Sequence, residues 1–499
     1  MKKKLDSLRR IVWPLLYAVI MLPMCFSIYY SVPACDDFAA AYRLNGQGLV
    51  EQAIERTTSM WWTWGGRWLT QFFQVIINPL NSHQHLGHKY GIYMIVLFFI
   101  TSAILIYSIK VFVERLFSHK NTRVVRTVTY LTVALFFTTY YYSECYNWFV
   151  GAMVYTVAMP LGLLAIAAMI RYADGIGNQN VNYAIMIIAA IFPATIEWCD
   201  PPLGLAYVYF IYYCNLNKRI HEPIGKKIKN AIPLLIYIIL GISNVFAPGN
   251  FVRREYYQLN NSVLSSFKQY VIDVVIRIQD IIVEHPLAVL LFLILIAIGV
   301  ASNNEKNKPE RMIDFIVFMV LVTTGGVFPY IYARGFTTTY LDIRVEYVLD
   351  FCLELTMAFV CVKLGQWLRY KFDFNINAKD IIGITVVLVL FAYSSILQNY
   401  AYLNITPIAI MRNSVLIKDS YEFWDDVLKE IENSDEENVV IYRDKEPAWS
   451  WYFYATGMVE GELYNVSPEK IYDEEFIMPN VYYGKESIEI KYTQKSNEE

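Results

Sequence analysis

The chain of 499 residues is 56% hydrophobic and 16% aromatic but only 17% charged, which is too apolar for a soluble protein of this length. Its formal net charge is −3, and no basic domain is present, so nucleic acid is excluded as a partner. The apolar residues fall in blocks of about 20, the length that crosses a bilayer as a helix. We therefore predict a polytopic α-helical membrane protein.

The N-terminus, MKKKLDSLRR, precedes a long apolar run. This arrangement resembles a signal peptide, but the run at residues 11–31 exceeds the usual apolar core of such a peptide. The following segment, VPACDDF, also lacks a small-residue cleavage site. We predict that the run is retained as the first helix.

Apolar runs and the breaks between them predict about eleven transmembrane helices. Lys and Arg are concentrated in alternate short loops, which predicts a cytoplasmic N-terminus. Four of the five loops on that side are clearly basic, and RYADGIGNQN is neutral. The predicted helices are 11–31, 90–113, 126–142, 149–170, 181–197, 201–216, 230–247, 285–302, 312–332, 345–364 and 380–398.

Two domains follow from this pattern. Residues 1–399 form a multipass membrane domain, whose first outer loop is 32–89. Residues 400–499 are more polar and form a small extracytoplasmic α+β domain. In that tail, SYEFWDDVLKEIE predicts an amphipathic helix capped by Ser420, and ENVVIYRD and SIEIKY predict strands.

The first outer loop opens with a pair of carboxylates, Asp36 and Asp37, directly after the first helix. Either could serve as a general base or metal ligand, and either could instead cap the next helix at its N-terminus. Neighbouring residues on a helix point about 100° apart. We therefore expect one carboxylate to act and the other to position it.

Further charges lie at predicted outer helix ends. Three acids could face the pair or be ordinary solvated helix ends: Glu144, Glu197 and Asp200. Outer loops are normally poor in Arg, so several arginines there suggest an anion site, although each alone could be solvated or snorkelling. These arginines are Arg67, Arg253, Arg254, Arg334 and Arg344.

Two aromatic clusters have alternative explanations. The first would stack on sugar or lie in the lipid interface: Trp61, Trp62, Trp64 and Trp68. The second lies in the tail and would bind sugar, or form the core of its own domain or dock it on the membrane: Trp449, Trp451, Tyr452 and Tyr454.

Cysteine and histidine give little evidence of a metal site. The seven cysteines form no CxxC motif, and a Cys145–Cys199 bridge competes with free buried thiols. His83, His85 and His88 lie close together but lack the spacing of a defined metal site. The sequence specifies no cofactor and leaves a divalent metal open.

The motifs PACDDF, GGRW, YNWFVGAMVY, APGNFVRR and MPNVYYGKESIEI resemble a family of uncharacterised bacterial multipass proteins described as glucosyltransferase-like. The order of a first helix, an acidic pair, many helices and an outer C-terminal domain resembles the GT-C glycosyltransferases. That resemblance implies a catalytic carboxylate at Asp36 or Asp37, with Asp36 favoured. The chain lacks the second-loop Asp-x-Asp pair of some metal-dependent relatives. It also lacks a WWDYG-like motif, which argues against an Asn-glycosylating oligosaccharyltransferase.

The resemblance implies an inverting glycosyltransferase in the bacterial cytoplasmic membrane. Its donor would be a polyprenyl-phosphate-linked sugar, and its acceptor a cell-surface glycan or lipid of the cell envelope. A transporter or flippase of lipid-linked saccharide is an alternative, as is a surface-polysaccharide ligase or polymerase. The predicted spans look almost bare of ionisable groups, which favours a one-sided enzyme over a transporter.

Overall fold

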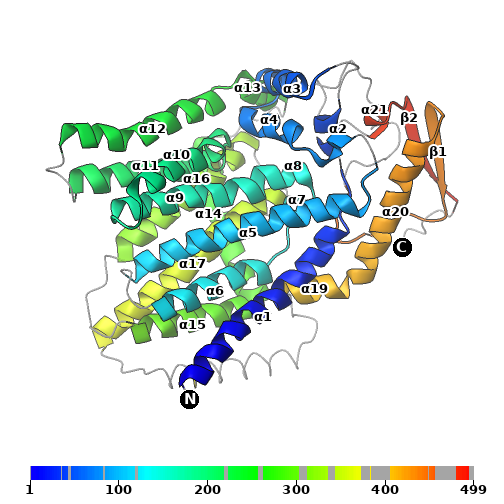
Figure 1. Cartoon of the computed structure of the whole chain (residues 1–499). Helices are drawn as coiled ribbons and strands as arrows, with labels where there is room; N and C mark the ends of the chain where they lie inside the picture. Colours follow the sequence, from blue (N-terminus) through cyan, green and yellow to red (C-terminus); the bar gives the residue numbers. More distant parts are fainter. Residues whose placement is uncertain are drawn as a thin grey trace.

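The computed structural model describes residues 2–34, 36–42, 47–82, 85–117, 122–217, 223–256, 262–302, 312–334, 343–372, 383, 405–447, 449–455 and 479–493. Over these residues the chain is mainly helical, with one small sheet. The long helices run roughly side by side (Figure 1). The sheet, α2 (Asp36–Ala41) and α20 (Ser414–Asn433) gather at one end of this bundle, which we call the sheet end.

Ten of the eleven predicted membrane segments coincide with helices, and the eleventh, 380–398, lies outside the described residues apart from residue 383. The ten correspond to α1 (Lys2–Tyr29), α5 (His88–Leu116), α6 (Thr122–Thr138), the continuous run of α8 (Phe149–Ala152), η2 (Met153–Val157) and α9 (Ala158–Ala173), α10 (Gln179–Ile191), α11 (Asp200–Ile211), α12 (Ile224–Val245), α15 (Pro286–Ser302), α16 (Met312–Arg334) and α17 (Ile343–Phe372).

Fewer helices meet the requirements for crossing a membrane. Within the described part of the chain, three are long and apolar enough: His88–Leu116, Phe149–Ala173 and Ile224–Glu255. A fourth arises if α14 (Val263–Glu284) and α15 count as one span, although they meet at an angle of 94°. Eleven spans are thus not confirmed. One reason is length, since the 13 residues of α10 reach only about 20 Å.

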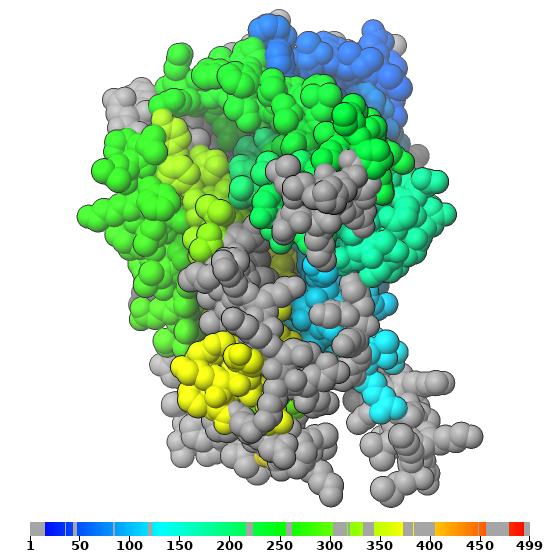
Figure 2. Space-filling view, turned by 90° about the vertical axis from the view of Figure 1, so that its left-hand side faces the viewer, coloured from blue at the N-terminus to red at the C-terminus, as the bar shows by residue number. Residues whose placement is uncertain are grey.

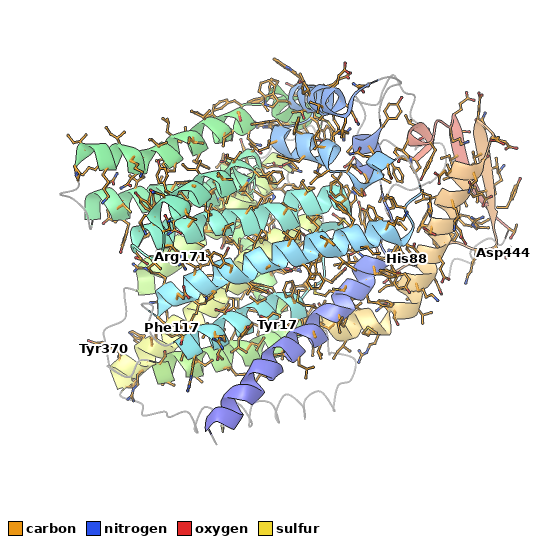
Figure 3. All side chains as sticks on the ribbon, viewed as in Figure 1. Tyr17, His88, Phe117, Arg171, Tyr370 and Asp444 are labelled. Atoms are coloured by element: carbon orange, nitrogen blue, oxygen red, sulfur yellow. The ribbon has the colours of Figure 1, made fainter. Side chains whose placement is uncertain are left out.

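Close helix contacts hold the bundle together. The helices α15 and α17 approach at two glycines, and a Cβ added to Gly365 would lie 2.1 Å from the carbonyl oxygen of Ile296. The first helix crosses α5 and α6, where the Tyr17 hydroxyl donates to the Tyr130 carbonyl at 3.0 Å. Figure 3 places Tyr17 between the two ends of the bundle. It also places His88 and Asp444 towards the sheet end, opposite Arg171 and Tyr370.

Short elements build the sheet end and its flank. They are α3 (Leu49–Thr63), α4 (Trp68–Ile76), η1 (Pro79–Ser82), α7 (Ser143–Tyr146), α13 (Pro248–Tyr256), α19 (Thr406–Arg412), β1 (Asn438–Arg443), α21 (Pro479–Tyr482) and β2 (Ser487–Tyr492). Two more short helices, η3 (Pro193–Thr195) and η4 (Tyr212–Asn217), flank α11. In Figure 2, which faces the other end of the bundle, the orange and red C-terminal elements are out of view.

Both predicted strands of the tail are confirmed. The strands β1 and β2 pair in parallel, with Asn438 opposite Ser487. The predicted cap of the tail helix is wrong, because α20 begins at Ser414 and contains Ser420 in its interior. There the buried Ser420 hydroxyl donates to the Leu416 carbonyl at 2.7 Å, one turn earlier.

Candidate functional site

An open cavity lies between α2, α3, α4, α8, α13 and α17. It contains about 1080 Å³ of space, its mouth included. Among the described residues that line it, four are arginines and two are carboxylates: Arg56, Arg67, Arg253, Arg344, Asp36 and Glu197. We call it the arginine cavity. It joins segments that are up to about 300 residues apart in the sequence.

The GGRW segment forms one wall because its glycines allow close packing. A Cβ on Gly66 would lie 2.0 Å from the Asn244 carbonyl oxygen at the end of α12. A Cβ on Gly249, which follows α12, would lie 2.5 Å from the backbone nitrogen of Trp64. Only backbone fits in these gaps. The contact brings Arg253 of α13 beside Trp64.

Asp36 is the first residue of α2, and its half-buried side chain lines the arginine cavity. Burial raises the pKa of this carboxyl above its ordinary value, because the charged form loses water. The positive charges of Arg56, Arg344 and Arg67 act in the opposite direction. Asp36 is therefore a carboxylate that faces guanidinium groups across a cavity able to admit a ligand.

Asp37 turns the other way and is fully buried. Its carboxylate accepts hydrogen bonds from the Tyr90 hydroxyl at 2.6 Å, the Val150 amide at 3.0 Å and the Ala34 amide at 3.2 Å. Burial raises the pKa of Asp37 to about 7, although these hydrogen bonds oppose the shift. The side chain joins α2 to α5 and α8. Asp37 thus fixes the helix that presents Asp36.

Arg67 and Glu197 form a bidentate ion pair in one wall of the arginine cavity. The Arg67 Nε lies 2.9 Å and 2.7 Å from the two carboxylate oxygens, and its Nη2 also contacts Glu197. Burial alone would raise the pKa of Glu197, but the Arg67 charge and hydrogen bonds lower it to about 2. Glu197 therefore stays ionised and orients Arg67, in keeping with the bidentate geometry of such pairs.

Arg344 enters the cavity from the start of α17. Its Nε lies 3.6 Å from Glu144 Oε2, and its guanidinium lies 5.6 Å from the Trp148 ring centre. Glu144 itself is absent from the cavity lining. A Cβ on Gly151 would lie 2.0 Å from the Glu144 carbonyl oxygen, so this glycine lets α7 approach α8. Glu144 thus orients Arg344 from behind.

The remaining two arginines have different settings. Arg253 lies over the Trp64 ring, with its guanidinium carbon 5.3 Å from the ring centre. Arg56, which the sequence analysis missed, is only 2% exposed, and its Nη1 lies 3.3 Å from the Ala39 carbonyl oxygen. A signal was present, since Gln52 and Arg56 lie one helical turn apart, as a shared polar face requires. Both side chains are buried.

Two other predicted residues do not join this group. Arg254 is exposed and lies over Tyr332, 5.5 Å from the ring centre. Asp200 packs against α12, where a Cβ on Gly241 would lie 2.7 Å from its Oδ1. The Arg334 side chain lies outside the described part. Asp200 and Arg254 therefore do not line the arginine cavity, because their helices direct them elsewhere.

The tryptophans of the first outer loop divide among different roles. Trp64 lines the cavity. The indole nitrogens of Trp61 and Trp68 donate to the backbone and the hydroxyl of Ser243, at 3.0 Å and 2.9 Å. Trp62 is 57% exposed. One tryptophan is thus placed to contact a ligand, and two anchor α3 and α4 to α12.

The tail aromatics also separate into two groups. Tyr454 is buried and stacks on Trp148, with ring centres 5.1 Å apart, so it supports a wall of the arginine cavity. Tyr452 packs beside Tyr141. Trp449 and Trp451 point outward, with 66% and 61% of their surfaces exposed.

Histidine and cysteine show no metal site in the described part of the chain. His85 Nε2 lies 2.9 Å from Asp425 Oδ1, and His88 stacks between Tyr29 and Tyr421. His83 lies outside the described residues. Among those residues, no group of three or more His, Cys, Asp or Glu could hold a metal ion. Cys145 and Cys199 are free, buried thiols, as the alternative to a bridge predicted.

Comparisons with models of protein families, with curated proteins and with solved structures find no match to this chain. Four guanidinium groups and two carboxylates leave an excess of positive charge, which suits an anion. Asp36 adds a proton acceptor at the same place.

Proposed function

We propose that the chain is a membrane glycosyltransferase of GT-C-like architecture. It moves a sugar from a polyprenyl-phosphate-linked donor to a glycan or lipid acceptor at the extracytoplasmic face. The observation that supports this best is the arrangement of Asp36 opposite arginines in one open cavity. The proposal also rests on the resemblance of the sequence motifs.

The arginines hold the donor phosphate. Arg253 and Arg344 come from different helices and line the same cavity, so both are available to the donor phosphate. Arg56 is buried in the cavity wall, and its positive charge acts on the Asp36 carboxyl. Guanidinium groups bind phosphate oxygens through paired N–H donors. As the phosphate departs, these charges stabilise the negative charge that develops on it.

Asp36 acts as the general base. Its carboxylate accepts the proton of the acceptor hydroxyl while that oxygen bonds to the anomeric carbon. The bond between this carbon and the phosphate oxygen breaks, and the phosphate leaves with the electron pair. Attack from the face opposite the phosphate inverts the anomeric centre. The raised pKa of Asp36 suits a base that must hold the proton briefly.

The test uses purified full-length protein in proteoliposomes with a panel of radiolabelled polyprenyl-phosphate sugars and envelope glycan acceptors. We expect wild-type protein to transfer label from at least one donor and Asp36→Asn to lose nearly all transfer. Equal transfer by wild type, Asp36→Asn and Asp37→Asn would refute the assignment of the base. Binding of polyprenyl phosphate tests the phosphate site separately.

A flippase for the same lipid-linked saccharide is the second candidate. Its support is that α17 buries three ionisable side chains: Asp350, Glu354 and Lys363. The expectation of nearly bare spans is therefore wrong for this helix. These charged residues were overlooked because most of the residues around them in the sequence are apolar. Translocation of a fluorescent lipid-linked sugar by wild type and Asp36→Asn alike, without transfer, would favour the flippase.

A further inference from the structure

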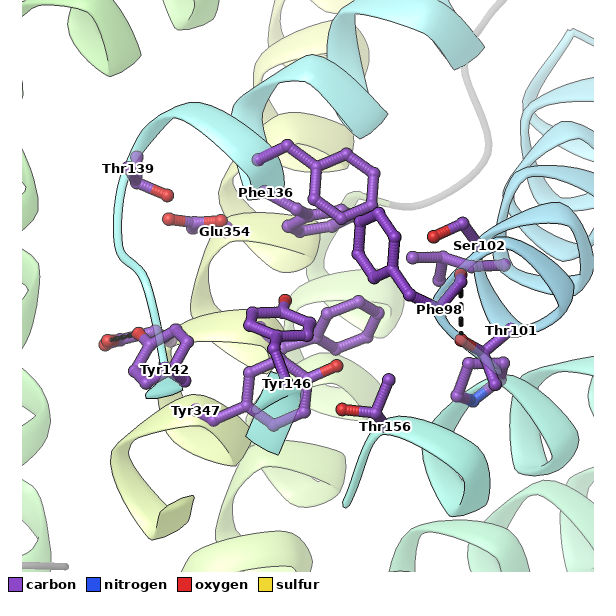
Figure 4. Close-up of a pocket in the computed structure, with 15 residues that line it drawn as sticks. Phe98, Thr101, Ser102, Phe136, Thr139, Tyr142, Tyr146, Thr156, Tyr347 and Glu354 are labelled. Atoms are coloured by element: carbon purple, nitrogen blue, oxygen red, sulfur yellow. Dashed lines mark hydrogen bonds between the residues drawn. The ribbon is translucent and has the colours of Figure 1, made fainter. Parts of the chain in front are cut away.

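A second cavity, separate from the arginine cavity, lies between α5, α6, α7, η2 and α17 (Figure 4). It contains about 450 Å³ of space, open edges included, but its interior holds only one or two water-sized guests. Aromatic rings form most of its walls: Phe98, Phe136, Phe137, Tyr142, Tyr146, Tyr347 and Phe351. Glu354 lines it too, and we call it the Glu354 cavity.

The helix α17 carries carboxylates at intervals of four residues, so Glu346, Asp350 and Glu354 share one face. Arg277 of α14 neutralises part of this charge. Its Nε and Nη2 both lie 2.6 Å from Asp350 oxygens, and Nη2 lies 3.5 Å from Glu346. The Tyr142 hydroxyl also donates to Asp350. Arg277 therefore forms ion pairs with Asp350 and Glu346, and it does not contact Glu354.

Glu354 is that third carboxylate, and it is 2% exposed. Its Oε1 has no hydrogen-bond partner in the described part of the protein. None of the ion pairs among the described residues includes it either. In Figure 4 its carboxylate lies beside Thr139. An ionised carboxylate that is buried without a counter-charge is costly, so Glu354 either takes up a proton or binds a cation within the cavity.

The carboxylates of the lining favour a positive guest over an anion. Thr139 lies beside Glu354 and hydrogen-bonds to it, whereas Thr101 and Thr156 lie across the cavity in Figure 4. The Thr139 hydroxyl brings no charge, so it does not balance the carboxylate. Glu354 Oε1 is an oxygen ligand of the kind that a hard cation takes.

We propose that the Glu354 cavity binds one small alkali cation, with Glu354 as its charged ligand. The size of the cavity excludes an organic amine, and its position within the bundle gives no role in sugar transfer. The charged and titratable groups around Glu354 come from several elements, while α5 and α9 contribute none to the lining. These groups are Asp350 and Tyr347 on α17, Arg277 on α14, Tyr140 between α6 and α7, and Tyr142 and Tyr146 at α7.

The experiment measures the thermal unfolding of the full-length protein in detergent, without any need for its activity. Sodium, potassium and N-methylglucamine chlorides are compared at equal ionic strength, and pH is varied in the last of these. We expect a bound cation to raise the Tm by about 2–4 °C at saturation. Dependence on sodium or potassium identifies an alkali ion. Dependence on pH alone, removed in Glu354→Gln, overturns the proposal, because protonation of the Glu354 carboxyl explains it without a bound cation.

Two variants make the result specific. Glu354→Gln keeps the shape but removes the charge, so its Tm should no longer respond to the cation. Glu346→Gln removes a charge from the same face of α17 outside the cavity, and it should respond as wild type does. A wild-type Tm that does not depend on sodium or potassium overturns the proposal, and this result does not require any variant to fold. Loss of the response in both variants also overturns it, because general charge on α17 would then explain the effect.

Discussion

The arginine cavity and the Glu354 cavity bury charge of opposite sign. The first is open, is lined by four arginines and two carboxylates, and has walls from loops and short helices. The second is narrow and aromatic, and its lining includes two carboxylates, Asp350 and Glu354, but no arginine. Since buried charge must be balanced, the first cavity suits a large anion and the second a small cation.

The two cavities also balance their charges differently. In the arginine cavity, Glu197 and Glu144 hold Arg67 and Arg344 in place from the wall. In the Glu354 cavity, Arg277 forms an ion pair with Asp350 but not with Glu354. A paired charge orients a neighbour, whereas a charge without a protein partner calls for a ligand. The predictions below test this difference, from the largest effect to the smallest.

Replacing Asp36 with Asn should have the largest effect, because it removes the proposed base and little else. We expect transfer to fall about 10²–10⁴-fold, the usual value of general-base catalysis. The Tm should change little, since Asp36 is only half-buried. Radiolabel transfer and thermal unfolding are measured together. Asp435→Asn, which removes an exposed carboxylate of the tail, serves as the control.

Replacing Asp37 with Asn should instead destabilise the fold. The new amide would place an N–H group against a donor, either the Val150 amide or the Tyr90 hydroxyl. We expect a loss of about 2–4 kcal/mol in the free energy of unfolding. Denaturant unfolding in detergent measures it. Asp37→Asn that is as stable as Asp36→Asn would contradict the positioning role.

Replacing Arg253 with Ala should weaken the binding of polyprenyl phosphate by about 10–100-fold, the range for a lost charge-assisted contact. Arg254→Ala is the matched control, because its side chain lies outside the cavity and should leave affinity unchanged. Glu354→Gln should also leave it unchanged. Equal losses in Arg253→Ala and Arg254→Ala would show that general surface charge, and not the cavity, attracts the lipid.

The Arg67–Glu197 ion pair should make the stability of the fold depend on pH in the acidic range. The pKa of Glu197 in the folded protein is about 2, below its usual 4.5, so the pair stabilises the fold above about pH 4.5. That contribution is lost as the pH falls from 4.5 towards 2, by at most about 1.4 kcal/mol per pH unit. The Tm of Glu197→Gln should therefore fall less steeply in this window. If the Tm of wild type and of Glu197→Gln fell equally with pH, the stabilising role of the ion pair would be contradicted.

Replacing Trp451 with Ala should have the smallest effect on stability, within about 0.5 kcal/mol, because the side chain is 61% exposed. Tyr454→Ala should cost more, about 2–4 kcal/mol, since its buried ring stacks on Trp148. Unfolding of the two variants compares them directly. Similar values would show that the tail does not support the arginine cavity.

Much of the architecture could be predicted from local patterns. Apolar runs located ten helices, and alternation located β1 and β2. The start of α20 was missed because Ser420 resembles a cap, although the helix extends six residues further. Arg56 was missed although Gln52 and Arg56 share one face of α3, because only packing against α2 shows that this face is buried. Asp200 and Arg254 were expected at the site because both map to the predicted outer face, Asp200 at a helix end and Arg254 in a loop where Arg is unusual.

By itself, the sequence determines that this chain is a helix-rich protein with membrane-length apolar segments, because hydrophobicity and its period act locally. It also marks Asp36, Asp37 and several arginines as unusual for their positions. Only the tertiary structure decides that Asp36 and Arg344 face one cavity while Asp37 turns into the core. It alone separates Glu354 from its neighbours on α17. Helix packing sets these contacts, and packing depends on residues hundreds of positions apart.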